Sequence, residues 1–124
     1  MKRDMDLIRQ ILFQIESHES GYAPNNIIVD GYTNEQIGYH IFIMIEGGLV
    51  KGIDVSSTHS SSPQAIVRRL TFSGHEFIDA ARSESVWKKA KNLLEAQGSS
   101  INTVTMGVLT QLLSSIIKQQ LGLS

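Results

Sequence analysis

The chain has 124 residues, 41% of them hydrophobic, and its 11 lysine and arginine side chains nearly balance its 12 aspartate and glutamate side chains, giving a net charge of −1. That length predicts a single domain with one core, and the near-zero charge provides no global field to attract nucleic acid or an anionic membrane. The absence of cysteine excludes disulfide bonds, thiolate metal sites and a cysteine nucleophile.

The first segment has the periodicity of an amphipathic helix. Asp4 is a suitable N-cap, Asp6 lies at the positive end of the helix dipole, and Gly21 is a suitable stop. We therefore predict a helix from about Asp4 to Glu19, with an apolar stripe of Ile8, Ile11, Leu12 and Ile15. No apolar run here approaches the roughly 20 residues that span a bilayer, so we expect a cytoplasmic protein without membrane contact.

The following segment combines turn signals with a short β-branched run. Pro24 and the two asparagines after it favour a turn. The run from Ile27 to Val29 has the composition of a strand. We expect it to be a small first strand of the sheet.

The second helix has complete start signals. Thr33 is the expected N-cap, Gln36 completes a capping box with it, and Tyr32 is placed to pack on Ile37. Two glycines at 47–48 end the helix. The residues predicted to face the core share one side of the helix: Ile37, Ile41, Met44 and Ile45.

The opposite side of this helix is also apolar. Tyr39, Phe42 and Ile43 fall there when residues are placed 100° apart, together with two glutamates. A helix that is apolar on two faces is either buried on both or presents one of them to a partner. The sequence leaves both alternatives open.

Two β-rich runs come next and predict an antiparallel hairpin. Leu49 to Val55 alternates in polarity, and Ala65 to Phe72 supplies the partner strand. Gly52 is interpreted as a tolerated strand glycine. The connection from Ser56 to Pro63 is mostly hydroxyl residues and too long for a tight turn, so we expect a mobile tip that projects into solvent. The side chains predicted to share one side of the first strand are Leu49, Ile53 and Val55.

Three further helices are predicted after the hairpin. The first begins at Ser73 as N-cap with Glu76 at the third helical position, and Phe72 is placed to pack on Phe77. After a break at 82–85, the second has an apolar stripe of Val86, Trp87, Ala90, Leu93 and Leu94 and ends at Gly98. The third spans about 104–121, ends before Gly122, and has a stripe of Val108, Leu109, Leu112, Leu113, Ile116, Ile117 and Leu121.

The order of these elements predicts an α+β fold. A helix that leads into a long-tipped hairpin, followed by another helix, is the arrangement of a winged-helix domain. We expect a winged-helix-like core over residues 4–82, built as helix, short strand, helix, β-hairpin and helix. Two additional C-terminal helices over 83–124 complete one domain that covers residues 1–124.

Several sequence blocks resemble a known family. They are MKRDMDLIR at the start, YHIFIMIEGGLV in the middle, RLTFSGHEFIDAAR after the hairpin and VWKKAK beyond it. From Met1 to about Lys91 the chain resembles a bacterial and phage family known only as a domain of unknown function, similar to YjcQ-like winged-helix proteins. The resemblance implies a fold and supplies no catalytic residues.

DNA binding is the first functional hypothesis. A recognition helix needs polar side chains that reach base edges, and phosphates need cations nearby. The second helix has glutamates but no lysine or arginine, so the cations would have to come from the hairpin. The predicted base-edge residues are Asn34, Gln36, Tyr39 and His40, and the predicted phosphate contacts are Lys51, Arg68 and Arg69.

A protein-interaction module is the alternative. The apolar outer side of the second helix and the stripe of the last helix are the candidate surfaces, although such stripes normally lie in a core. The last helix could also form a homodimer with twofold symmetry. The candidate partner-binding residues are Tyr39, Phe42, Ile43, Leu109, Leu112 and Ile116.

The sequence does not favour an enzyme. The four histidines lack the His-x-x-x-His spacing that places two ligands on one helical face, and no cysteine could complete a zinc site. The glycines at 47–48 follow a helix and therefore do not form a phosphate-binding loop. The hydroxyl groups of the tip have no adjacent base to activate them. We expect no catalytic residues, no metal and no cofactor.

Overall fold

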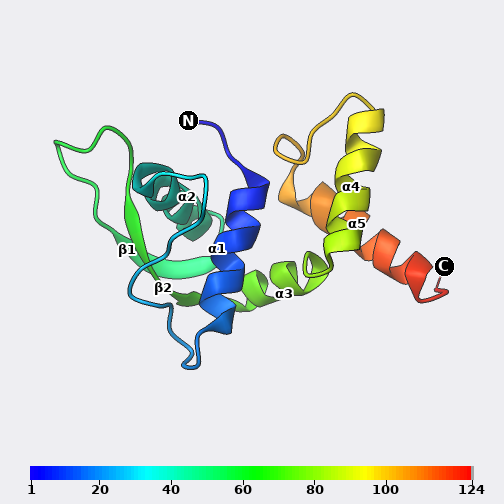
Figure 1. Ribbon diagram of the computed structural model, residues 1–124, viewed down its shortest axis with the longest axis horizontal. Helices are drawn as coiled ribbons and strands as arrows, with labels where there is room; N and C mark the ends of the chain where they lie inside the picture. Colours follow the sequence, from blue (N-terminus) through cyan, green and yellow to red (C-terminus); the bar gives the residue numbers. More distant parts are fainter. Residues whose placement is uncertain (124) are drawn as a thin grey trace. The chain divides into compact units, whose positions relative to one another are not determined.

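The computed structural model describes residues 1–123 and has an α+β fold (Figure 1). Over these residues, five helices accompany a two-stranded antiparallel hairpin, and their order is compatible with a winged-helix-like arrangement. The elements are α1 (Met5–Ser17), α2 (Asn34–Glu46), β1 (Val50–Asp54), β2 (Ala65–Leu70), α3 (Phe72–Ala80), α4 (Glu84–Ala96) and α5 (Met106–Gln120).

The chain divides into two compact units. The first covers Met1–Glu76, and the second begins at Phe77. This division falls within α3, earlier than the boundary at residue 82 that the sequence suggested between core and extension. A single domain over the whole chain stays a prediction.

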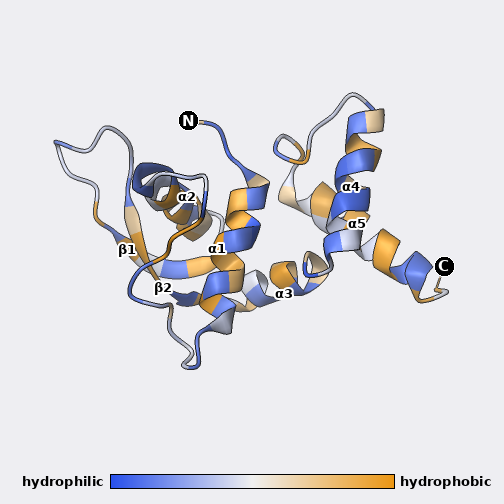
Figure 2. Ribbon diagram, viewed as in Figure 1, coloured by the Kyte–Doolittle hydropathy of each residue, from blue (hydrophilic) through white to orange (hydrophobic). Residues whose placement is uncertain are grey.

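The first helix confirms its predicted start. Asp4 is the N-cap, and its side chain accepts a hydrogen bond from the backbone N–H of Leu7. The helix ends at Ser17, slightly before the predicted Glu19, where the backbone N–H of His18 bonds back to Ile15. It packs against α2 and β2, and Figure 2 shows hydrophobic and hydrophilic bands alternating along it. The buried hydrophobic residues of α1 are Met5, Leu7, Ile8, Ile11, Leu12 and Ile15.

The second helix confirms the capping box. Thr33 accepts from the backbone N–H of Gln36, whose side chain accepts in return from the backbone N–H of Thr33. Gly47 is the C-cap, and Gly48 has a φ of 79°, a backbone conformation that favours glycine. The predicted core side is buried at Ile37, Ile41 and Met44 and half-buried at Ile45.

The predicted strand at Ile27–Val29 is wrong. These residues form no strand, and over the described chain a single main-chain bond joins residues 19–32 to the hairpin, from the Ala23 N–H to the Arg68 carbonyl at 2.7 Å. Ile27 and Val29 are nevertheless buried, while Ile28 is exposed. The segment therefore contributes alternate side chains to the core without pairing along the sheet.

The hairpin confirms antiparallel pairing and contains an irregularity. Lys51 pairs with Arg69 and Gly52 with Val67, so Arg68 is an extra residue in β2. Gly52 is required at this point and is not simply tolerated. A Cβ atom there would lie 2.3 Å from the Ile66 carbonyl oxygen, closer than real side chains approach.

The third helix begins earlier than predicted. Thr71, two residues before the predicted cap Ser73, accepts from the backbone N–H of Gly74 and donates to the Gly48 carbonyl. Phe72 is 80% exposed while Phe77 is buried, so the predicted packing between these two rings is wrong. Thr71 thereby connects the start of α3 to the turn that follows α2.

The tip between the strands is internally hydrogen-bonded. Its loop extends beyond the ends of both strands (Figure 1). The backbone N–H of Ser57 donates to the Ser60 hydroxyl, and the backbone N–H of Ser60 donates to the Ser57 carbonyl. At the base of the loop, the Ser62 hydroxyl donates to the Glu35 carboxylate of α2. The expected mobility stays a prediction, but the loop base is attached to α2.

The second unit is helical. Ser83 caps α4 through the backbone N–H of Val86, and α4 packs against α5. Trp87 is buried edge-on to Phe77, with ring centroids 6.3 Å apart. Leu93 is largely exposed, so the predicted stripe of α4 is buried only in its first half. Gly122 follows α5 with a φ of 76°, as expected of a terminator.

Candidate functional site: the hairpin and the cleft beside it

A buried polar network joins α1 to α2. The Asp4 backbone N–H donates to His40 Nε2 at 2.9 Å, and His40 Nδ1 donates to the Gln36 carbonyl at 2.7 Å. The Tyr32 hydroxyl donates to the Asp4 carboxylate at 2.8 Å. Burial raises the pKa of Tyr32 to about 12, aided by this bond and by the negative charges of Asp4 and Asp6. The network orients the two helices within the first unit.

This network includes two of the residues predicted to read DNA bases, and their contact with DNA stays a prediction. His40 is only 2% exposed, and both of its ring nitrogens already have protein partners. The Gln36 side-chain oxygen is engaged in the capping box. Asn34 is exposed and Tyr39 is half-buried, on a helix that carries Glu35 and contains no lysine or arginine.

The predicted phosphate contacts come together on the hairpin. Lys51 and Arg69 are cross-strand partners, Arg68 is adjacent to both, and all three are exposed. We call these three residues the basic cluster. It lies where β1 begins, whereas Asn34 at the start of α2 lies near the opposite end of the hairpin, beside the Gln64 side chain that bonds to Glu35. The two predicted halves of a DNA site therefore occupy different ends of the hairpin.

An exposed apolar strip lies next to the basic cluster. Ile53 and Ile66 are cross-strand partners and are 51% and 58% exposed, and Val55 is 44% exposed. Their side chains alternate with Val50, Ala65 and Val67, which are buried on the side of the hairpin that contacts α2. We call the basic cluster and this strip together the outer face. Sequence alternation had grouped Ile53 and Val55 with Leu49, which is buried.

Hydrogen bonds of Asp54 and Ser56 hold the loop next to the outer face. Asp54 accepts a hydrogen bond from the backbone N–H of Ser56 at 2.8 Å, and this bond with a further one to the Ser56 side chain lowers the pKa of the Asp54 carboxyl. The Ser56 hydroxyl in turn bonds to both backbone groups of Gln64. The end of the hairpin nearest α2 is thereby fixed in place.

The predicted partner-binding residues are not all accessible. Tyr39, Phe42 and Ile43 on α2 are half-buried. Leu109 and Ile116 on α5 are buried and Leu112 is half-buried, and partner binding by these residues stays a prediction. A helical stripe shows which residues share a side of the helix, but it does not show whether the chain itself covers that side. Homodimer formation through α5 stays a prediction.

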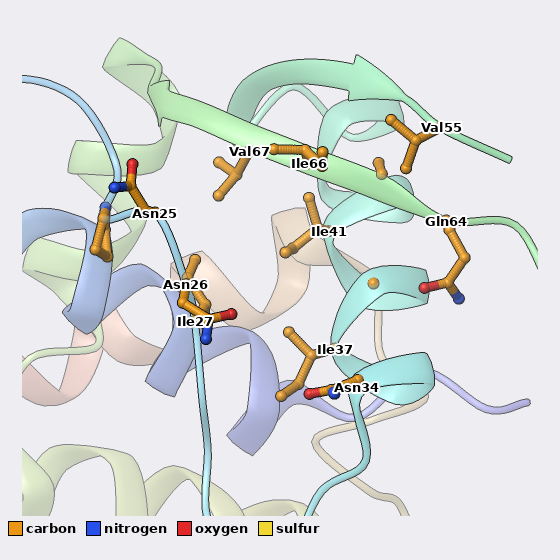
Figure 3. Close-up of a pocket in the computed structure, with 13 residues that line it drawn as sticks. Asn25, Asn26, Ile27, Asn34, Ile37, Ile41, Val55, Gln64, Ile66 and Val67 are labelled. Carbon is orange, nitrogen blue, oxygen red and sulfur yellow. The ribbon is translucent and has the colours of Figure 1, made fainter.

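A cleft of about 240 Å³ lies between α2, β2 and the segment that carries Asn25 and Asn26 (Figure 3). In this view Ile37 and Ile41 project from α2 toward the segment with Asn26 and Ile27, and Val67 lies on β2. The buried wall residues are Ile27, Ile37, Ile41 and Val67, and the polar rim residues are Asn25, Asn26, Asn34 and Gln64.

The side-chain amide of Gln64 is held in place at the rim. Its Nε2 donates to the carbonyl oxygens of Glu35 and Pro63 and to the Ser62 hydroxyl. Its Oε1 lies over Gly38, only 1.9 Å from where a Cβ atom would be, so the absence of a side chain there makes room for it. Sequence reasoning missed the whole cleft, because the asparagines at 25–26 were interpreted only as turn residues.

Within residues 1–123, no group of three or more histidine, aspartate or glutamate side chains is placed to hold a metal ion. Over the same range, no helix has the length and apolarity needed to cross a membrane.

The fold and the site define an α+β protein that is compatible with a winged-helix-like arrangement and has one exposed face of its hairpin. The family model described as "Hypothetical protein (DUF2513)" matches residues 2–100, and the chain belongs to this family. It is also similar to a protein of Haemophilus influenzae with the name "Uncharacterized protein", at 34% identity over 125 residues that cover 98% of this chain and 100% of the relative. No solved structure matches the chain.

These comparisons confirm the resemblance to a family of unknown function. The further similarity to YjcQ-like winged-helix proteins stays a prediction. The family match ends at residue 100, before α5 begins at Met106, whereas the alignment with the Haemophilus protein covers nearly the whole chain.

Proposed function

We propose that this protein is a non-enzymatic binding protein and that it binds another protein through the outer face of the hairpin. The observation that carries the proposal is the pairing of Ile53 with Ile66, two large apolar side chains that are each more than half exposed. Single exposed apolar residues are normal on a protein surface. A contiguous apolar strip beside arginines fits a protein interface, whose centre is apolar and in which arginine is enriched.

The charges of the basic cluster restrict the kind of partner surface that the outer face can bind. Lys51, Arg68 and Arg69 lie at one end of the strip, and none of them forms an ion pair within residues 1–123. An acidic group of the partner would gain from this local positive charge, although the chain as a whole carries a net charge of −1. We therefore propose a partner surface in which apolar residues adjoin acidic ones.

DNA is the second candidate, and the basic cluster is the observation that favours it. Three exposed cations within one hairpin could contact neighbouring phosphates. The apolar strip would contribute nothing to such contacts, and His40, one of the predicted base-contacting residues, is only 2% exposed. Binding by phosphate contacts alone would be independent of sequence.

The test replaces the paired isoleucines with threonine, which is also β-branched and suits a strand. The Ile53→Thr/Ile66→Thr variant should lose a protein partner that the unaltered chain retains in a capture experiment from its native cells. Ile28→Thr is the matched control, because Ile28 is exposed in the same unit but lies outside the hairpin. Equal capture by all three proteins would contradict the proposal.

Mobility shifts with duplex DNA at two ionic strengths distinguish DNA binding from protein binding. If DNA is the partner, Arg68→Glu/Arg69→Glu should weaken binding and flatten its salt dependence, whereas the isoleucine variant should bind as the unaltered chain does. Under the protein proposal, duplex binding is absent even at low salt.

A further inference from the structure

The edge of β2 that does not pair with β1 has unpaired backbone groups facing the cleft. Val55 donates its N–H to the Gln64 carbonyl, so Val55 and Gln64 form a hydrogen-bonded pair of the ladder. Such pairs alternate in antiparallel sheets, so Ile53 and Ile66 form the next one. The backbone groups of Ala65 and Val67 must then point away from β1, toward the other edge of the strand.

That edge is occupied at one point within residues 1–123. The Ala23 N–H bonds to the Arg68 carbonyl, after which the chain from Pro24 to Ile27 turns away from β2. Figure 3 shows this divergence, with the Asn25–Ile27 segment leaving β2 beside Val67 and passing opposite α2. The cleft fills the gap where the predicted first strand would have paired.

The chemistry of the cleft favours an uncharged occupant. None of its lining residues is charged, so a buried charge on a ligand would lose its hydration without compensation. Within residues 1–123 the side chains of Asn25, Asn26 and Asn34 make no hydrogen bond, and Gln64 Oε1 accepts none. Carboxamides both donate and accept, as peptide groups do.

We propose that the cleft binds an extended, uncharged peptide segment of another protein, which pairs with the free edge of β2 at Ala65 and Val67. Alternate apolar side chains of the segment would contact the wall formed by Ile37 and Ile41, and the rim carboxamides would bond to its remaining peptide groups. Strand addition of this kind takes affinity from main-chain bonds and specificity from alternate side chains.

The dimensions favour a peptide over an enclosed small molecule. The cleft volume of about 240 Å³ lies below the roughly 300 to 1,000 Å³ of typical small-molecule pockets. A short extended segment needs no enclosure, because it lies along a strand edge and inserts only some of its side chains. The free backbone groups of Ala65 and Val67 also provide a donor and acceptor pattern that repeats along a peptide.

The first experiment selects binders from a displayed library of short random peptides with the full chain as bait. Enriched peptides should be uncharged and should alternate apolar residues. On binding the selected peptide, amide hydrogen exchange should slow at Ala65 and Val67, while Ile66, already in the hairpin ladder, should change little. No enrichment, or enriched peptides that leave exchange at Ala65 and Val67 unaltered, would overturn the proposal.

Two variants test the contacts with the selected peptide. Asn34→Asp places a carboxylate on the rim but suits the start of α2, so the fold should be preserved while affinity falls roughly tenfold. Asn92→Asp, on the exposed surface of α4, is the matched control and should leave affinity unchanged. Equal affinity of both variants would contradict a peptide in the cleft.

Ala65→Pro is the sharper variant, because it removes one outward N–H without removing a ladder bond to β1. Circular dichroism checks its fold, and peptide binding should be lost. The cleft shares Val55 and Ile66 with the outer face, so the single variant Ile53→Thr is used to separate the two proposals. Ile53 does not line the cleft, so the Ile53→Thr variant should still bind the selected peptide even if it no longer binds the partner of the outer face.

Discussion

His40 accepts a hydrogen bond from the backbone N–H of Asp4, 36 residues earlier in the chain, at 2.9 Å. The bond joins the imidazole of α2 to the N-cap residue of α1, while the other ring nitrogen donates to the Gln36 carbonyl. A side chain that looked suitable for reading DNA therefore serves the packing of two helices.

His40→Leu should destabilise the protein by about 1 to 3 kcal/mol, because the Asp4 N–H and the Gln36 carbonyl lose their partner. Urea unfolding measures the change. His59→Leu in the exposed tip is the control and should shift stability by no more than about 0.5 kcal/mol. Equal effects at the two positions would show that the network contributes little.

Gly52→Ala should destabilise the hairpin by roughly 1 to 3 kcal/mol or more, since the added methyl group would collide with the Ile66 carbonyl and with Val67. Gly107→Ala on α5 meets nothing within 4 Å and should stabilise by up to about 1 kcal/mol. Thermal unfolding of both variants gives the comparison. A neutral result at position 52 would contradict the close approach.

Thr71→Val should cost about 1 kcal/mol, because it removes the cap of α3 and the bond to the Gly48 carbonyl while keeping the β-branched shape. Ser73→Ala, at the cap position that the sequence suggested, should cost little. If chemical denaturation ranks the two variants in the reverse order, the helix begins where the sequence pattern placed it.

Tyr32→Phe should change how stability depends on alkaline pH. The folded pKa of Tyr32 is about 12 against 10.0 for the free side chain, so its contribution is complete below pH 10 and is lost as the pH rises toward 12. The stability difference between the unaltered chain and Tyr32→Phe should shrink over that interval. Tyrosinate absorbance should lose its component near pH 12 in this variant and retain it in Tyr22→Phe, whose ring is exposed; persistence in both would contradict the assignment.

Much of the fold was readable from local sequence. The capping box of Thr33 and Gln36, the glycine pair after α2 and the antiparallel hairpin were all predicted and confirmed. Caps and turns depend on residues within a few positions of one another, so their signals are present in short windows of sequence.

The errors share a different cause. Ile27–Val29 has the composition of a strand, but pairing requires a neighbouring strand edge along the whole run. Within residues 1–123, the segment 19–32 makes one main-chain hydrogen bond to β2, from Ala23. Likewise Thr71 caps α3 with help from the distant Gly48 carbonyl, which no local window contains. Composition gives a preference, and tertiary contacts decide whether it is satisfied.

The candidate site was likewise predicted only in part from the sequence. The cations of the hairpin were identified individually from the sequence, and strand pairing places Lys51 opposite Arg69. The apolar strip and the cleft were not found, because each depends on which face α2 covers and where the 23–29 segment departs from β2.

By itself, the sequence determined the helix caps, the hairpin and the absence of any thiol chemistry, since those follow from residue type and short spacing. Only the tertiary structure decided that His40 is buried, that Ile53 and Ile66 are exposed, and that one edge of β2 is left open. Exposure and pairing are properties of what lies beside a residue in space, and segments far apart in the chain supply those neighbours.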